Sequence, residues 1–325
     1  MMGWFGQDRR PAIDQEDPGD EQALRGVLAR VRRIEVVAQR LVNEQLGGRY
    51  HSIFKGRGMS FDEVRPYAPG DEVRLIDWNV SARTGQLHVK RFVEERELTV
   101  MLVADASLSM DFGLSAARWS GREGIQIAED RKREVAAQIA AAVALSAQIN
   151  GDRVGLLVFG DQVVRFIPPK KGRRHALRVI REVLTMRHGG SPTDLAGALS
   201  YLGRVLKRRA ALFLISDFHV GDFERELRVA VRRHDVHAFL VRDPVEGDLP
   251  EAGLVTLRDL ESGERVVVPT DRKTRERYRQ LVRAEEDRCR QVWDRYRVPW
   301  TRFSTDESYE RALTRHFARL KGKTL

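Results

Sequence analysis

The stretch Leu98–Met110 reads LTVMLVADASLSM, and it is the part of the chain that indicates the fold most clearly. Its first seven residues are almost all apolar, which is typical of a central parallel strand covered on both faces. The run ends in Asp105, Ser107 and Ser109, and ligands of doubly wound sheets bind where strands end. Carboxylate and hydroxyl oxygens are hard ligands that favour Mg²⁺ or Mn²⁺, so the stretch predicts a buried strand that ends in a metal site.

Two later segments carry similar oxygen atoms at comparable places. Ala210–Asp217 is a second apolar strand that ends in a carboxylate, and Gly189–Asp194 is a Gly/Pro loop that opens a helix. Loops that follow neighbouring parallel strands converge, so we predict that three loops meet at one site. The predicted metal ligands are Asp105, Ser107, Ser109, Thr193 and Asp217. The structural alternative is two buried strands with capping hydroxyls and turn aspartates.

Length, composition and cysteine content indicate a globular protein of a reducing compartment. The 325 residues suffice for one large domain or two small ones, and 42% of them are hydrophobic. Cys289 is the only cysteine of the sequence, which excludes a disulfide framework and a thiolate metal site. No apolar run approaches the roughly 18–20 residues of a membrane span, so we expect a cytoplasmic protein without one.

The chain is strongly basic, with a formal net charge of +10. Such a charge is compatible with nucleic acid, acidic protein surfaces or anionic lipid as partners. Basic residues are mostly mixed with Glu and Asp at helical spacing, as in Arg283–Arg288, and this mixture is typical of a solvated helix face. We therefore do not expect nucleic-acid binding.

Apolar spacing and turn formers divide the chain into three parts. Residues 1–20 predict a disordered tail, and residues 21–97 predict a helix followed by a β-rich segment, in which residues 86–94 form a strand that leads into the central one. Residues 98–325 alternate between strands and helices, with a hairpin insertion near residues 253–268. This alternation predicts an α/β fold, a doubly wound and mostly parallel sheet with helices on both faces.

Several chemically reactive side chains are expected to be structural. His234 and His237 lie at a predicted junction of helix and strand, so we do not interpret them as a metal pair. Cys289 lies on the apolar stripe of a predicted helix over residues 272–297, together with Leu281 and Trp293. We expect all three of these side chains to point into the core.

The three-loop oxygen set resembles the metal-ion-dependent adhesion site of von Willebrand factor A domains. A second set of motifs resembles the family called domain of unknown function 58, whose members carry a von Willebrand A-like domain. This resemblance implies a von Willebrand A-like fold and a partnership with MoxR-type AAA+ ATPases. It covers residues 45–320 and is carried by Phe54–Tyr67 (FKGRGMSFDEVRPY), Pro69–Arg74 (PGDEVR), Ile76–Trp78 (IDW), Ala82–Thr84 (ART) and the strand ends quoted above.

One departure from the family pattern concerns a metal ligand. The chain reads Gly-Gly-Ser-Pro-Thr-Asp over residues 189–194, where the commoner form is Gly-Gly-Thr-Asp. Either Ser191 or Thr193 can therefore be the hydroxyl ligand. We favour Thr193, because Asp194 and Leu195 follow it as they do in the family.

The segment over residues 50–83 has two interpretations. Asp77, Trp78 and Arg83 are expected to form a buried ion pair that an aromatic ring covers. The segment is then either a folding signature that braces the sheet or a docking surface for the ATPase. The sequence alone leaves both open.

The function that these features predict is binding without turnover. A Mg²⁺ or Mn²⁺ ion with an open coordination position would bridge the chain to a carboxylate of a partner, so we predict a non-enzymatic adaptor for a MoxR-type ATPase and its client proteins. The rival is a metal-dependent hydrolase, a phosphatase or nuclease, that uses the same residues. Such an enzyme needs a general base or an activated water, and no residue of the sequence is evidently placed for that role.

Overall fold

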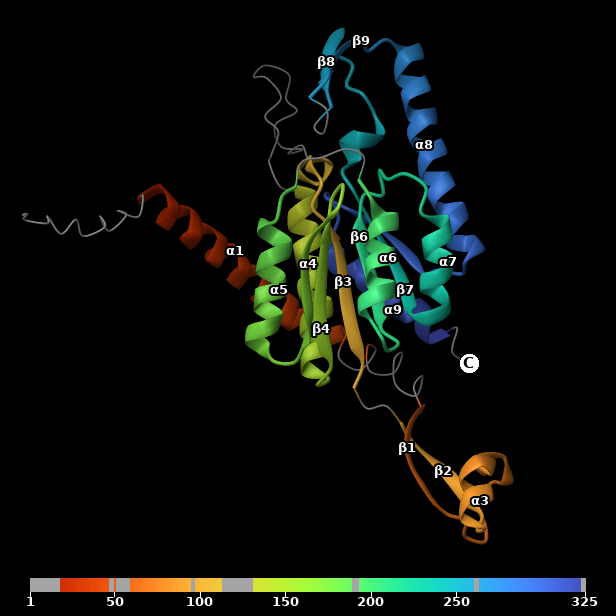
Figure 1. The fold of residues 1–325 in the computed structure, drawn as a ribbon. Coiled ribbons are helices and arrows are strands. Elements are labelled where there is room, and N and C mark those ends of the chain that lie inside the picture. The colour runs from red at the N-terminus through yellow and green to blue at the C-terminus, as the bar shows by residue number, and fades with distance from the viewer. Residues whose placement is uncertain are drawn as a thin grey trace, which may run out of the picture.

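The computed structural model describes residues 18–46, 50, 59–94, 97–112, 131–188, 193–259 and 263–322. Its centre is a six-stranded sheet in the order β10-β7-β6-β3-β4-β5, shown in Figure 1. All neighbouring strands run parallel except β5, which pairs antiparallel with β4 at one edge. The strands are β3 (Thr99–Asp105), β4 (Arg153–Phe159), β5 (Val163–Lys170), β6 (Ala211–Ser216), β7 (Asp235–Arg242) and β10 (Trp300–Ser304).

Helices cover both faces of this sheet, as the sequence predicted. One face packs against α1 (Pro18–Leu41), α4 (Arg131–Ile149), α5 (Arg173–Thr185) and α9 (Tyr309–Gly322). The other packs against α6 (Leu195–Val205), α7 (Glu224–Arg233) and α8 (Arg272–Arg295). Successive side chains of a strand point to opposite faces, so the buried residues of β3 alternate between the two cores. A continuous apolar run is the pattern that such double coverage requires.

Two small antiparallel sheets lie outside the central one. The first pairs β1 (Met59–Pro66) with β2 (His88–Glu94), and the connection between them holds the short helices η2 (Val73–Leu75) and α3 (Trp78–Thr84). The second is the predicted hairpin, β8 (Leu254–Arg258) with β9 (Arg265–Pro269). Figure 1 shows the β1–β2 unit beyond the amino ends of the central strands and the hairpin beyond their carboxyl ends.

The β1–β2 unit differs from expectation in two ways. β2 pairs with β1 and does not extend the central sheet. Asp77 forms its ion pair with Lys90 and caps α3 by accepting hydrogen bonds from the next turn, whereas Trp78 is 65% exposed. The expected pair of Asp77 with Arg83 beneath an aromatic ring is therefore wrong. The position of Asp77 at the start of a helix decides its contacts.

Other boundaries and burials differ more locally. α1 begins at Pro18, inside the segment predicted as a tail, and residues 1–17 lie outside the described part of the chain. Cys289 and Trp293 are buried as expected, but Leu281 is 62% exposed. Leu281 lies on the amino-terminal half of α8, and Figure 1 shows that this half extends past the carboxyl ends of the central strands.

A pair of buried histidines joins β7 to α9. His237 Nδ1 lies 3.1 Å from His316 Nε2, and His316 Nδ1 lies 2.9 Å from the Thr301 hydroxyl. His237 thus contacts a residue far along the chain rather than His234, which agrees with a structural role. Burial, with His237 and Arg319 nearby, lowers the pKa of His316 well below its ordinary value.

We predict that this pair makes the fold sensitive to acid. Because His316 is held neutral in the folded state, its stabilising effect is present above the unfolded pKa near 6.5 and is lost as pH falls. The free energy of unfolding should fall by about 1 kcal/mol from this source between pH 7 and 5.5, measured by urea denaturation. His316→Phe should flatten this dependence and His88→Phe, in the β1–β2 unit, should not. An unchanged slope in His316→Phe would contradict the assignment.

Candidate metal centre

The predicted site lies where the direction of the chain connections reverses. After β3 the chain passes through α4 to β4 on one side, and after β6 it passes through α7 to β7 on the other. β3 and β6 are neighbours, so the loops that leave their carboxyl ends diverge. In open α/β sheets such a divergence creates the crevice in which ligands bind.

Asp105 is held at the bottom of this crevice. It is only 4% exposed, its Oδ1 accepts a hydrogen bond of 2.9 Å from Ser107 N, and its Oδ2 accepts one of 2.6 Å from the Ser216 hydroxyl. The bond from Ser216 joins the ends of β3 and β6, and the bond from Ser107 closes the turn after β3. They also fix the carboxylate, since each oxygen already has a donor.

The two predicted serines follow in the same turn. Ser107 precedes η3 (Leu108–Asp111) and is fully buried, whereas Ser109 is half-buried. Their hydroxyl oxygens are 3.0 Å apart. Arg133 of α4 supports the turn by donating to Ser107 O at 3.2 Å and to Asp111 Oδ1 at 2.5 Å. The two hydroxyls are therefore held close together in the turn that follows Asp105.

The third loop reaches the same edge. Thr193 is 3% exposed and forms a parallel bridge with Val220, in the loop that follows β6. Asp194 caps α6 by accepting a hydrogen bond of 2.7 Å from Gly197 N, and its own N–H donates to Gly160 O. Thr193 is thus positioned by the start of the helix, as its place before Asp194 indicated. The alternative ligand Ser191 lies outside the described residues.

Asp217 is fixed by an unusual backbone conformation. The next residue, Phe218, has a φ of 55°, in the left-handed region that bulky residues avoid. Its buried ring packs edge-on against Trp293 at 5.0 Å, and its N–H donates to the Ser216 hydroxyl. Aromatic packing therefore stabilises a strained turn directly beside a predicted ligand, which is where such strain is commonly found in proteins.

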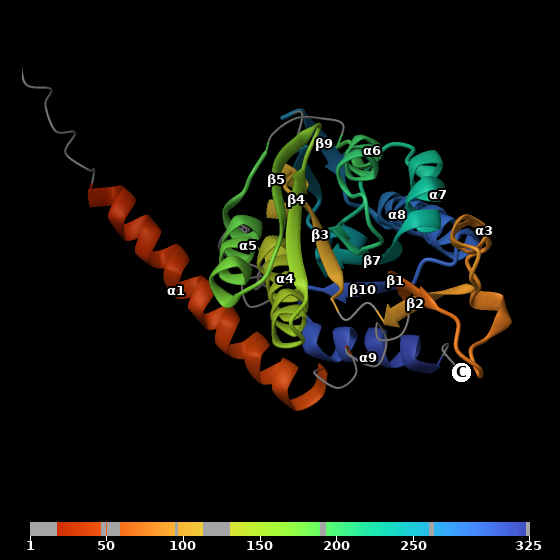
Figure 2. The same ribbon diagram turned by 60° about the horizontal axis from the view of Figure 1, so that its bottom comes forward.

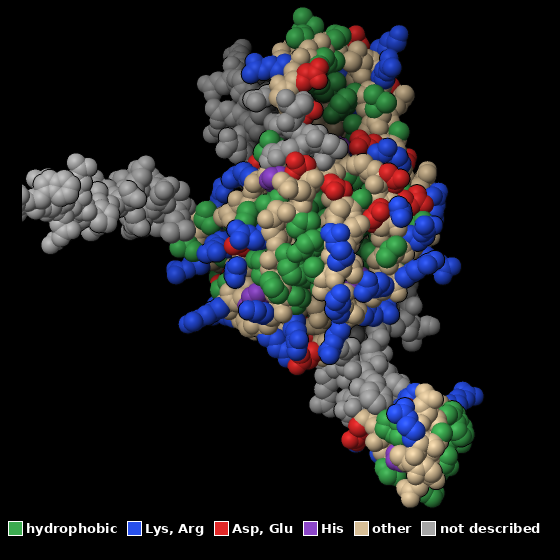
Figure 3. Space-filling view, viewed as in Figure 1, with side chains coloured by type: hydrophobic (Ala, Val, Ile, Leu, Met, Phe, Trp, Pro, Cys, Tyr) green, Lys and Arg blue, Asp and Glu red, His purple; other side chains and the backbone are tan. Residues whose placement is uncertain are grey.

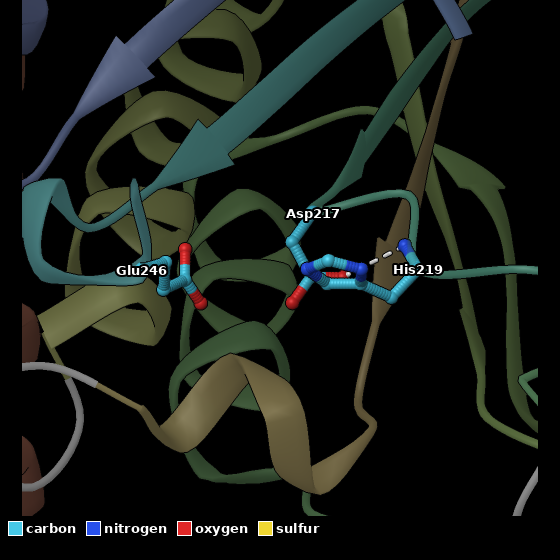
Figure 4. A group of neighbouring side chains, drawn as sticks. All are labelled: Asp217, His219 and Glu246. Carbon is cyan, nitrogen blue, oxygen red and sulfur yellow. Dashed lines mark hydrogen bonds between the residues drawn. The ribbon is translucent and has the colours of Figure 1, made fainter. Parts of the chain in front are cut away.

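Sequence reasoning missed the charged partners of Asp217. The buried ammonium of Lys132 donates to Asp217 Oδ2 at 2.7 Å and also to Glu246 Oε1, in the helix η5 (Pro244–Gly247). Figure 4 shows Asp217 with Glu246 on one side and His219 on the other, and ligand atoms of these three residues lie within 4.8 Å of one another. Lys132 thus supplies a positive charge between the carboxylates of Asp217 and Glu246.

The two predicted carboxylates differ in their affinity for protons. Burial and the charge of Asp217 raise the pKa of Asp105 to about 6, although hydrogen bonds from Ser107 and Ser216 oppose the rise. Burial acts on Asp217 in the same direction, but Lys132, His219 and Arg242 outweigh it and hold its pKa well below the ordinary value. A divalent cation would stabilise both carboxylates in their charged form.

The donor chemistry fits a hard divalent ion. The structure brings Asp105, Ser107, Ser109, Thr193 and Asp217 to one edge of the sheet, and all of them offer oxygen. His219 has both ring nitrogens engaged, Nδ1 with Glu285 and Nε2 with Arg242. Although His219 lies close to Asp217, it is therefore not well placed to bind a metal ion.

The missed residues differ in how visible they were in the sequence. Asp243 and Glu246 form a capping box across η5, and the spacing Asp-Pro-x-Glu was a readable sign of that turn. Lys132 and Arg133 looked like the solvated start of a helix, yet their side chains are 0% and 1% exposed. The sequence shows no sign of this burial, because it arises from contacts with segments 50 to more than 100 residues away.

Comparison with known proteins places the chain in a family. The model of a family described as "Protein of unknown function DUF58" matches residues 63–288. The chain belongs to the DUF58 family. Uncharacterised proteins of Mycobacterium bovis and Mycobacterium tuberculosis are each 35% identical to it over 239 residues, which cover 72% of this chain and 71% of theirs.

Solved structures resemble this DUF58 chain only weakly. The conserved hypothetical protein BatB from Bacteroides thetaiotaomicron aligns with a TM-score of 0.42 at 13% identity, over 69% of this chain and 99% of that one. An aerotolerance-related membrane protein from Bacteroides fragilis aligns with a TM-score of 0.39 at 12% identity, over 70% and 99%. Similarities at this level carry no argument about function. In this chain, none of the described helices has the length and apolarity to cross a bilayer.

We predict that Mg²⁺ or Mn²⁺ stabilises the fold through these residues. A metal at about a hundred times its Kd adds about 2.7 kcal/mol to the free energy of unfolding, visible as a higher melting temperature. Asp105→Ala should abolish the response. The matched control is Asp152→Asn, because Asp152 is equally buried but accepts hydrogen bonds from Tyr50 and Leu98 at the opposite edge of the sheet. Equal responses in wild type and Asp105→Ala would exclude the site.

We also predict that Lys132→Met makes the protein depend on metal. Removing one partner of a buried ion pair costs roughly 3–5 kcal/mol, so the variant should melt far below wild type when a chelator is present. Because an ion at the site restores positive charge near Asp217, the metal-induced rise in melting temperature should exceed that of wild type. A smaller rise than in wild type would indicate that Lys132 and the metal do not compensate the same carboxylate.

Proposed function

We propose that this DUF58 protein is a non-enzymatic, metal-dependent adaptor that binds other proteins. Mg²⁺ or Mn²⁺ would be held by Asp105, Ser107, Ser109, Thr193 and Asp217, and an open position on the ion would accept a carboxylate from the partner. The observation that carries this proposal is the pair of hydroxyls of Ser107 and Ser109, 3.0 Å apart in the turn that follows Asp105 at the carboxyl end of β3. Hydroxyl ligands leave more positive charge on the ion than carboxylates do, and so favour an external anion.

The proposed partners are a MoxR-type AAA+ ATPase and its client proteins. Three observations support this proposal: membership of the family, a central sheet whose strands are mostly parallel, and the three-loop oxygen set. Together they favour a von Willebrand A-like domain. We further propose that the protein works in the cytoplasm. Nucleic acid is not favoured, because Lys and Arg are scattered over the face seen in Figure 3 and form no continuous stripe there.

The β1–β2 unit is the surface that we propose for the ATPase. Val73, Trp78 and Leu87 are 63%, 65% and 47% exposed, a concentration of apolar side chains that a free surface does not need. The unit lies at the opposite end of the central strands from the predicted metal. An adaptor with separate surfaces can hold the ATPase at one end and a client carboxylate at the other.

The rival hydrolase is less well supported by the geometry. A hydrolase needs a group that takes a proton from water, and His219 is the nearest candidate. Its ring nitrogens contact Glu285 and Arg242, and Lys132 is occupied by two carboxylates. These contacts already engage both side chains, so neither His219 nor Lys132 is placed to act as that base.

Co-purification from the native cell tests the proposal. Wild type should recover an AAA+ ATPase and client proteins. The double variant Ser107→Ala, Ser109→Ala should lose the clients, because it removes two hydroxyl ligands. The backbone bonds of that turn remain, since Asp105 and Arg133 contact Ser107 through main-chain atoms. Trp78→Ala should lose the ATPase and keep the clients.

Two outcomes would contradict the proposal. If wild type recovers no AAA+ protein, the partner assignment fails. If the serine variant, with an unchanged circular dichroism spectrum, recovers every partner, the ion is not the bridge. Phosphoester hydrolysis that scales with purified wild-type protein and disappears in Asp217→Ala would favour the hydrolase.

A further inference from the structure

A second candidate site lies between α6 and α7, which cover one face of the central sheet. The two helices run side by side over one face of the sheet, as Figure 1 and Figure 2 both show. Between them is a cavity of about 370 Å³ whose floor includes Leu212 of β6 and His234, at the end of α7. None of its lining residues belongs to the predicted metal site.

His234 is the feature that indicates a ligand. The residue is only 3% exposed, and neither ring nitrogen has a hydrogen-bond partner among the residues that the structure describes. A buried polar group without a partner lowers the stability of the fold by about 1–3 kcal/mol. A ligand that bonds to this group would offset the loss. Burial, with Arg233 and Arg209 nearby, lowers the pKa of His234, so the ring is neutral and offers one donor and one acceptor.

The walls of the cavity combine apolar and cationic surface. Leu199, Leu202 and Val229 supply apolar contacts, and Val229 is 51% exposed. Arg204, Arg225 and Arg233 line the same cavity with a single acidic residue, Glu226.

Arg233 spans the gap between the two helices. Its guanidinium donates to Gly203 O at 2.8 Å and to Leu206 O at 3.2 Å, which fixes a positive charge across the cavity. A guanidinium carries five N–H groups, so these bonds leave others for a ligand.

We propose that this cavity binds a small amphipathic carboxylate, with its apolar body against the leucines and Val229 and its carboxylate among the arginines and His234. The volume is that of a small-molecule site, which is commonly about 300–1,000 Å³, and is too small for a helical segment of a partner. The excess of arginine over glutamate favours an anion. The neutral imidazole of His234 lines the cavity and provides an N–H donor there.

Gly203 allows the cavity to be filled without disturbing the fold. It lies in α6 and lines the cavity, and a Cβ atom added to it would meet no atom within 4 Å outside its own turn of helix. Leucine is also a better helix former than glycine, so Gly203→Leu should not destabilise α6. Gly26→Leu is a matched control, because Gly26 lies in α1, outside the cavity, and also has open space around it.

The experiment is a fluorescence titration with 8-anilinonaphthalene-1-sulfonate, an aromatic anion, followed by displacement with decanoate. Wild type should bind the probe saturably, and decanoate should displace it. Gly203→Leu should lower the affinity for decanoate by about tenfold or more, whereas Gly26→Leu should bind decanoate like wild type. Decanoate binding that Gly203→Leu leaves unchanged would overturn the site.

Two further comparisons test the polar contacts. His234→Phe keeps the ring and removes both nitrogens, so it should melt no lower than wild type but bind decanoate about fivefold to tenfold more weakly. Decanol should displace the probe at least about tenfold less well than decanoate, because it has no charge to meet the arginines. If decanol competes as well as decanoate, or if His234→Phe binds like wild type, the carboxylate assignment is wrong.

Discussion

The buried ammonium of Lys132 is the interaction on which the candidate site depends. Asp105 and Asp217 end two neighbouring strands, and both are almost completely shielded from water. Two such carboxylates raise each other's cost of ionisation unless a positive charge lies beside them. Lys132 provides that charge to Asp217 and connects it to Glu246, so α4, the end of β6 and η5 are joined at one point. A metal ion at the site would share this role.

Rigid supports surround this charge cluster. Arg133 fixes the serine turn from the same helix, and the packing of Phe218 on Trp293 holds the chain in a left-handed turn after Asp217. Both supports are buried side chains from other parts of the chain, so the oxygens keep their positions in the absence of an ion. In the proposed adaptor, such preorganisation would let a partner's carboxylate bind without a rearrangement of the site.

The sheet could be predicted because its strands depend on local sequence, and so could the position of the proposed ligands at the ends of those strands. Leu98–Met110 and Ala210–Asp217 are strands on composition alone, and a parallel sheet brings their carboxyl ends to one edge. The alternation of elements predicted helices on both faces, and the structure has them. The β1–β2 unit was less readable, since its short strands pair with each other rather than with the central sheet. Trp78 is 65% exposed in this unit.

By itself, then, the sequence determined the order of the strands along the chain and the chemical character of their ends. Which strands are neighbours in the sheet, and which charges accompany the carboxylates, was decided by the tertiary structure. The run Arg131–Arg133 reads as solvated, yet Lys132 and Arg133 are buried because distant loops close over the start of α4. The orphaned ring of His234 could not be foreseen either. The burial of these side chains and their hydrogen-bond partners depend on segments far apart in the sequence, so the periodicity of the sequence does not predict them.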